Sequence, residues 1–161
     1  MAGKTKPKCR RHVVQVQNPV ALALNTATCL TPKEVKEVMA SVHRAVEAMR
    51  TGTATVDNWL NLVTAVSVGI SIEDQGVVKG LRNQLQEADV ILAKIEARAT
   101  TNGPWRSPTL YAHELVAIKE LATLHEFQIK QLSAGEFQKA VRLAIARFKD
   151  RGAKARRAAT A

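Results

Sequence analysis

One stretch of the chain, from Trp59 to Ile72 (WLNLVTAVSVGISI), carries no charged residue and constrains the fold more than any other part of the sequence. Its polar residues recur every three or four positions, which places them on one narrow stripe of a helix. Apolar side chains cover the rest of that cylinder. We therefore expect a buried central helix with other helices packed on it. The stripe consists of Asn61, Thr64, Ser67 and Ser71.

The composition favours a helical domain around this stretch. The chain has 161 residues, which suits one domain with a sizeable core. It is 46% hydrophobic but only 4% aromatic, so alanine, valine and leucine must build the core. A β-sandwich would normally carry more aromatic and β-branched residues. The sequence therefore predicts an all-α, single-domain bundle of about five helices with basic, flexible termini.

Signals for helix ends predict the first three helices. Thr31, Pro32 and Glu34 form a capping box with proline at the first helical position, and the helix they open is expected to end before Gly52. The second helix is expected over residues 56–68, with Gly69 as its stop. Residues 71–74 (SIED) then read as the capping box of a third helix over residues 72–99. Residues 66–72 also alternate like a strand, but the stop and cap signals favour helix.

Two more helices are expected in the second half. Ser107 and Pro108 predict the start of a fourth helix, which runs to about residue 132. Residues 133–136 (SAGE) form the capping box of a last helix, expected to end at Gly152. The chain then divides into a basic flexible arm over residues 1–18, a helical bundle over 19–151 and a basic disordered tail over 152–161. The apolar face predicted for the last helix consists of Phe137, Val141, Ala144, Ile145 and Phe148.

The net charge of +10 is concentrated at the two ends of the chain. Residues 1–12 hold five basic residues and no acid, and residues 142–161 hold seven basic residues and one acid. Residues 13–141 sum to −1. Basic ends on a neutral body are typical of proteins that contact phosphate backbones, although charge can also serve solubility alone. DNA and RNA are not distinguished by this pattern.

The residues expected to contact nucleic acid lie in the arm, on the outer face of the last helix and in the tail. They are Lys4, Lys6, Lys8, Arg10, Arg11, Lys139, Arg142, Arg147, Lys149, Arg151, Lys154, Arg156 and Arg157.

Trp105 and Arg106 lie in a loop between two prolines and have two interpretations. An exposed Trp beside Arg can stack on a base or anchor a partner protein. Alternatively, the Trp105 ring folds back as a lid over the helix ends. The first interpretation supports an alternative function, a protein-interaction adaptor or oligomeric module that uses this loop and the helix grooves.

Catalytic and metal-binding signals are weak. The sequence has no nucleophile motif, Walker loop or GxGxxG, and its carboxylates are spread singly over predicted helix faces. His43, His113 and His125 are expected on helix surfaces or at caps. Cys9, His12 and Cys29 lack a second pair at zinc-site spacing. We expect no enzyme activity, cofactor, metal or small-molecule substrate. With no apolar run that spans a bilayer and no signal peptide, we expect a cytoplasmic protein that does not bind membranes.

The chain contains several short motifs: Arg10-Arg11, Asn18-Pro19-Val20, residues 52–60 (GTATVDNWL), Leu124-His125 with Gln128, and Ser133 with Glu136. Together they resemble an uncharacterised family of small basic helical proteins from proteobacterial prophages. The similarity covers about residues 10–150, and it implies a phage or mobile-element origin and a bacterial host cytoplasm. It supplies no activity and no catalytic residue. Taken with the charge pattern, it predicts a phage accessory protein that binds nucleic acid.

Overall fold

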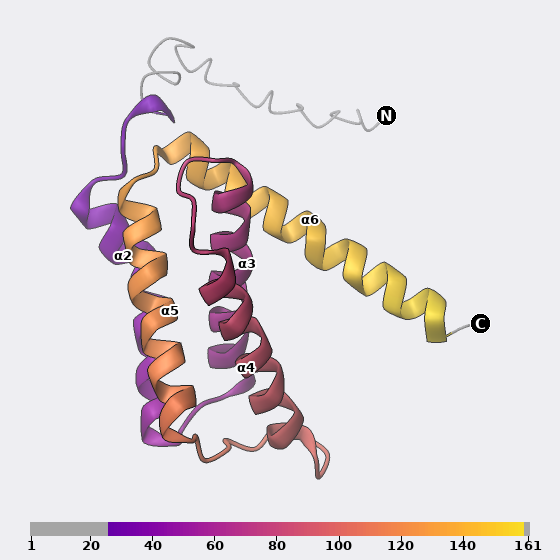
Figure 1. Cartoon of the computed structure of the whole chain (residues 1–161). Coiled ribbons are helices and arrows are strands. Elements are labelled where there is room, and N and C mark those ends of the chain that lie inside the picture. The colour runs from indigo at the N-terminus through magenta and orange to yellow at the C-terminus, as the bar shows by residue number, and fades with distance from the viewer. Residues whose placement is uncertain (1–25, 160–161) are drawn as a thin grey trace, which may run out of the picture.

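The helix α3 (Val56–Asp74) is the central element of the fold, and it contains the uncharged stretch (Figure 1). The computed structural model describes residues 26–159, with side chains as far as residue 149. The other helices are α2 (Pro32–Thr51), α4 (Arg82–Thr100), α5 (Ala112–Lys130) and α6 (Ala134–Ala159). Within residues 26–159 there is no strand, only an isolated bridge between Cys29 and Ser133. The all-α prediction is confirmed.

Each of the other helices within residues 26–159 packs against α3. The pairs α2–α5 and α4–α5 complete a four-helix bundle of antiparallel neighbours, and α6 lies across the end of α3 (Figure 1). Because α3 is covered on several sides, it can be apolar around most of its circumference. The prediction of a buried central helix is therefore confirmed. The largest fully buried apolar side chains are Met39, Leu62, Ile72, Leu85, Leu92, Ile95, Ile118, Leu121, Ile129 and Leu132.

The predicted boundaries of α2 are confirmed. The Glu34 carboxylate accepts the Thr31 backbone N–H at 2.8 Å, and the Glu34 N–H donates to Thr31 Oγ1 at 3.3 Å. These reciprocal bonds satisfy backbone donors that the first helical turn leaves without a partner. At the other end, Gly52 has a φ of 70°, a left-handed conformation that favours glycine.

The predicted stop at Gly69 and the predicted cap at Ser71 are wrong. The helix α3 continues through both residues, and the Ser71 hydroxyl donates to the Ser67 carbonyl at 2.8 Å. At Gly69, a Cβ would lie 2.9 Å from Gln128 Oε1 and 3.1 Å from Leu85 Cδ2. The glycine therefore allows close approach of α4 and α5, a tertiary requirement that resembles a stop signal in the sequence.

The turn between α3 and α4 lies at residues 75–81 instead, so the predicted start of the third helix at residue 72 is also wrong. Two glycines reverse the chain with left-handed backbone, Gly76 at a φ of 79° and Gly80 at 92°. The Gly80 N–H donates to the Glu73 carboxylate at 2.9 Å. These glycines shape the loop between α3 and α4.

Two other boundaries differ from expectation. The helix α5 begins at Ala112 rather than at Pro108, because the Ser107 hydroxyl accepts the Ala54 N–H at 3.1 Å and holds this loop against the start of α3. The helix α6 continues past Gly152 to Ala159. The residues after Gly152 (AKARRAA) are strong helix formers, which extend the helix beyond the glycine.

The chain reaches α2 beside the turn that joins α5 to α6. Leu30 donates its N–H to the Leu132 carbonyl at 3.1 Å, and Ala134 donates to the Thr28 carbonyl at the same distance. The predicted arm at residues 1–18 lies outside the described residues. Within the described part of the chain, no helix is both long and apolar enough to cross a membrane.

Candidate nucleic-acid interface

The helix α6 carries the basic face that the sequence singled out. Its predicted capping box is confirmed: the Glu136 carboxylate accepts the Ser133 N–H and hydroxyl, both at 2.8 Å. These hydrogen bonds lower the pKa of Glu136 and keep it ionised at the positive end of the helix. Ala140 and Ala144 are buried, and past them α6 extends away from the bundle (Figure 1).

The predicted apolar face of α6 is only partly covered. Ala144 is buried, but Ile145 remains 48% exposed and Phe148 37% exposed. The seam with the bundle runs instead along Ala140, Ala144 and Arg147, about 80° around the helix from the centre of the predicted arc. Only α3 makes an extensive contact with α6, and small alanines allow that close approach. The expectation that all five apolar residues pack inward is wrong for the outer two.

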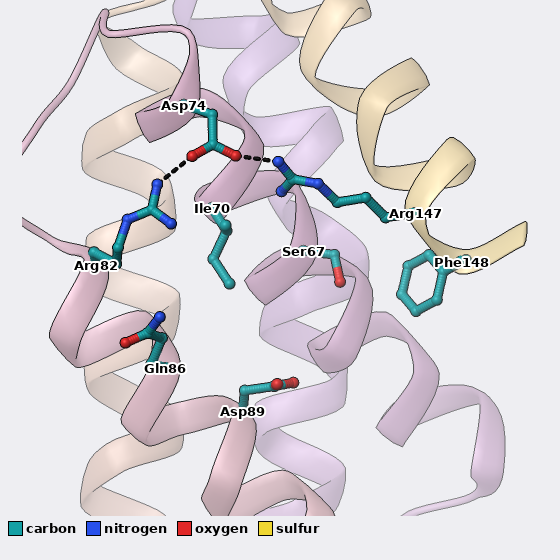
Figure 2. A pocket seen from close by; sticks show the side chains of 8 residues that line it. All are labelled: Ser67, Ile70, Asp74, Arg82, Gln86, Asp89, Arg147 and Phe148. Carbon is teal, nitrogen blue, oxygen red and sulfur yellow. Dashed lines mark hydrogen bonds and ion pairs between the residues drawn. The ribbon is translucent and has the colours of Figure 1, made fainter. Parts of the chain in front are cut away.

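Arg147 points into the bundle rather than outward. Its guanidinium pairs with the Asp74 carboxylate at the end of α3, and it also donates to Ser71 Oγ at 3.3 Å. The second Asp74 oxygen pairs with Arg82 at the start of α4. Figure 2 shows Asp74 between the two guanidiniums. Asp74 therefore ties α6 to both α3 and α4.

The pKa of Asp74 is lowered by this arrangement. The hydrogen bond from Arg147 has the largest effect, partial burial opposes it, and the hydrogen bond from Arg82 lowers the pKa further. Asp74 is thus charged throughout the neutral range, and each arginine has an acidic partner.

A groove of about 300 Å³ surrounds this cluster (Figure 2). Two arginines and two aspartates line this groove, so the formal charge of its lining is zero. Both guanidiniums already form ion pairs with Asp74. The groove is therefore poorly suited to an anionic ligand, and Arg147 differs from the other predicted contacts on α6. The lining residues are Ser67, Ile70, Asp74, Arg82, Gln86, Asp89, Arg147 and Phe148.

Three predicted contacts, Lys139, Arg142 and Lys149, are exposed on α6. Among the described side chains, none of the three forms an ion pair. They span about 80° of the helix circumference and about 15 Å of its length. The structure thus brings together three unpaired cations on one side of a projecting helix.

The remaining predicted contacts lie outside the described side chains. Arg151, Lys154, Arg156 and Arg157 belong to the last turns of α6, beyond the last described side chain. Lys4, Lys6, Lys8, Arg10 and Arg11 lie outside the described residues.

Trp105 is folded back onto the bundle. Its indole N–H donates to the Ala54 carbonyl at 2.8 Å, and its ring centroid lies 6.0 Å from that of Trp59. The Trp59 indole in turn donates to the Leu92 carbonyl at 3.0 Å. Of the two interpretations, the structure agrees with the second, in which the Trp105 ring folds back over the helix ends. Arg106 is exposed beside it.

The helix α5 carries a buried polar group that the sequence did not indicate. His125 is only 3% exposed, and its Nδ1 has no hydrogen-bond partner within the described structure. Gln128, one turn later, is also buried and donates to the Gly69 carbonyl at 3.1 Å. The expectation that His125 lies at the surface is wrong. Its spacing of four from Leu121 and from Ile129 was the available signal for burial.

A second missed group joins α4 to α5. Glu114 is 2% exposed and receives two hydrogen bonds from Arg98, at 2.7 and 2.6 Å, and one from the Tyr111 N–H at 2.9 Å. Burial alone raises the pKa of Glu114, but these hydrogen bonds lower it by more. The Arg98 guanidinium also lies 4.8 Å from the centre of the Tyr111 ring. Glu114 is therefore a buried, paired carboxylate and does not lie on a solvated helix face.

The described residues contain no candidate metal centre. No group of three or more His, Cys, Asp or Glu side chains there is placed to hold a metal ion. His43 lies 3.7 Å from Glu126, and His113 stacks on Tyr111. Cys29 is exposed, while Cys9 and His12 lie outside the described range.

Comparison of the chain with protein-family models, with curated proteins and with solved structures gave no match.

Proposed function

We propose that this chain is a non-enzymatic phage or prophage accessory protein that binds nucleic acid through its basic termini and the outer face of α6. The main support is the set of three exposed cations on α6, Lys139, Arg142 and Lys149, which form no ion pair among the described side chains. The chain continues past them with four more basic residues and one acid, while residues 13–141 sum to −1. Attraction for a polyanion is therefore strongest at the projecting helix and at the N-terminus.

The geometry suits contact with a phosphate backbone rather than reading of bases. The 15 Å between the first and last of these cations corresponds to about nine phosphates of duplex DNA. None of the three has an aromatic neighbour on the same face, so a stacking platform for single strands is not supported. We therefore propose binding with little sequence preference. If six cations contact phosphate, affinity should fall about 10³-fold between 50 and 200 mM salt.

Fluorescence anisotropy with random duplex and single-stranded DNA and RNA, across a salt series, tests this proposal. The informative variant is Lys139→Gln/Arg142→Gln/Lys149→Gln. If all three residues contact phosphate, the slope of log K against log salt should become shallower by about 2.7. Deletion of residues 1–12 should weaken binding in the same way.

A matched control replaces three other exposed cations, Lys33, Arg44 and Lys94, which form no ion pair among the described side chains. This control changes the net charge by the same amount but lies on α2 and α4. Its salt slope should change by less than about 1. Equal effects of the two triple variants would mean that net charge, not α6, governs binding. Absence of binding at 50 mM salt would refute the proposal.

The alternative, an adaptor that uses the Trp105 loop, has less support. The Trp105 ring and its N–H are both engaged in contacts within the bundle. An anchor residue for a partner protein would instead need a ring available to enter the partner's pocket.

A further inference from the structure

A groove between α4 and α5 combines an apolar surface with two carboxylates. Its volume is about 360 Å³. Val116, which is 62% exposed, and Leu124 are among the apolar side chains that line it. Glu87 of α4 and Glu120 of α5 also line it, and neither forms an ion pair among the described side chains. Among the described residues, no lysine or arginine lines this groove, so the formal charge of its lining is −2 when His113 is neutral.

The helix α6 carries an apolar stripe with cations along one edge. This α6 stripe consists of Val141, Ile145 and Phe148, which lie within about 60° of the helix circumference and span about 11 Å of its length. Arg142, three positions before Ile145, and Lys149, four positions after it, lie on the adjoining side of the helix. Ile145 and Phe148 are exposed, and this part of α6 extends away from the bundle, so the stripe is accessible to another molecule (Figure 1).

We propose that the α6 stripe binds in the α4–α5 groove of a second copy of this chain. An amphipathic helix that lays its apolar side into a groove is a common mode of protein recognition. The groove follows α5 for about 16 Å, from His113 to Leu124, which is long enough for the stripe. Each copy supplies one helix and one groove, so two copies can pair reciprocally about a twofold axis.

Charge complementarity favours the α4–α5 groove over a larger apolar groove. Arg142 and Lys149 bring two positive charges to the edge of a lining whose formal charge is −2. The larger groove, of about 520 Å³, lies between α2 and α5. The charged residues that line it are Lys36, Lys130 and Glu126, so with its histidine neutral its formal charge is +1. That sign of charge disfavours a basic helix.

The occupant is a second copy because α6 is held away from the groove of its own chain. Ala140 and Ala144 pack in a buried cluster with Ile72 of α3, which fixes α6 on that side of the bundle. Within residues 26–159, α6 makes no extensive contact with α4 or α5. Lys139 lies about 60° farther around α6 than Arg142, so it stays outside the groove and available to phosphate when two copies associate.

Charge reversal on the two surfaces tests this association in the nuclease-treated, full-length protein. Arg142→Glu/Lys149→Glu reverses the helix side, and Glu87→Arg/Glu120→Arg reverses the groove. In analytical ultracentrifugation, each variant alone should self-associate about tenfold more weakly than wild type, because like charges then meet at both contacts. An equimolar mixture of the two variants should recover the wild-type affinity, because each helix again meets a groove of opposite charge.

A matched control, Lys33→Glu/Lys94→Glu, makes the same change in net charge as the helix variant but on exposed residues of α2 and α4. It should self-associate like wild type. Wild type that remains monomeric throughout the concentration series would overturn the proposal. A mixture that recovers no affinity, or a control that weakens association as much as the helix variant does, would also overturn it.

Disulfide trapping between copies locates the contact independently. In a Cys9→Ser/Cys29→Ser background, a chain with Ile145→Cys is mixed with a chain that carries Val116→Cys in the groove. The control chain carries Val90→Cys instead, at an exposed valine of α4 that does not line the groove. The mixed disulfide should form about tenfold faster with Val116→Cys than with Val90→Cys, and equal rates would overturn the proposal. Neither measurement involves nucleic acid, so failure here is distinct from failure of the proposed function.

Discussion

His125 should make the stability of this protein depend on pH well above the range in which carboxylates titrate. Burial lowers the pKa of His125 from its ordinary value of 6.5 to about 4. Because the folded pKa lies below the unfolded one, the unfolded chain binds the proton more readily. The stabilisation from neutral His125 is therefore complete above pH 6.5 and is lost as the pH falls toward 4.

The magnitude follows from linkage. At pH 5 the unfolded histidine is almost fully protonated, whereas the buried one carries about a tenth of a proton. Each pH unit below 6.5 then removes about 1.4 kcal/mol, so the free energy of unfolding should fall by about 2 kcal/mol between pH 8 and pH 5. For a domain of this size, the midpoint of thermal unfolding should fall by about 4–8 °C.

Urea unfolding followed by circular dichroism, at intervals between pH 8 and pH 5, measures this effect. The variant His125→Leu should lose about 2 kcal/mol of the pH dependence that wild type shows. A control variant, His113→Gln, removes an exposed histidine from the same helix. This variant should keep the full pH dependence of the free energy of unfolding. Asp74 and Glu114 have lowered pKa values and lose their stabilisation only at more acidic pH. If wild type and His125→Leu share one pH profile, the reasoning is refuted.

Three further substitutions test the packing by urea unfolding at neutral pH. Arg98→Met should lower the free energy of unfolding by about 2–3 kcal/mol, because it leaves the buried Glu114 carboxylate with only a backbone donor. The double variant Arg98→Met/Glu114→Leu should recover most of that loss, and no recovery would contradict the pairing argument. Gly69→Ala should destabilise the protein by about 1 kcal/mol, because crowding against Leu85 and Gln128 outweighs the gain in helix propensity. A more stable variant would show that these two side chains can move to accommodate the added methyl group. Asp74→Asn should destabilise the protein by about 1 kcal/mol and speed amide hydrogen exchange in α6. Unchanged exchange in α6 would show that the ion pairs do not hold this helix on the bundle.

Features governed by nearby residues were predictable. The capping boxes of Thr31 with Glu34 and of Ser133 with Glu136 depend on spacings of three residues, and both are present at the expected helix starts. The stop at Gly52 depends on one backbone conformation, which glycine adopts readily. For the candidate interface, the exposure of Lys139 and Arg142 followed from the charge pattern of α6.

Features decided by contacts between distant residues were not predictable in the same way. Gly69 fits a helix end as well as it fits a close helix crossing, and only the positions of Leu85 and Gln128 decide between them. Arg147 has the same residue type as its exposed neighbours on α6, but a carboxylate 73 positions earlier in the chain draws it inward. Sequence periodicity does not show where that partner will lie.

The sequence by itself determined that this protein is an all-α domain centred on the uncharged helix, with its excess charge at the ends. Apolar periodicity and local caps are sufficient for this, because they act within a few turns of one helix. Tertiary packing decides which polar groups are buried, including His125 and Glu114. It also decides which α6 cations lack an acidic partner among the described side chains. Burial and ion pairing depend on which helix faces meet, and that arrangement is set by the packing of the whole bundle around α3.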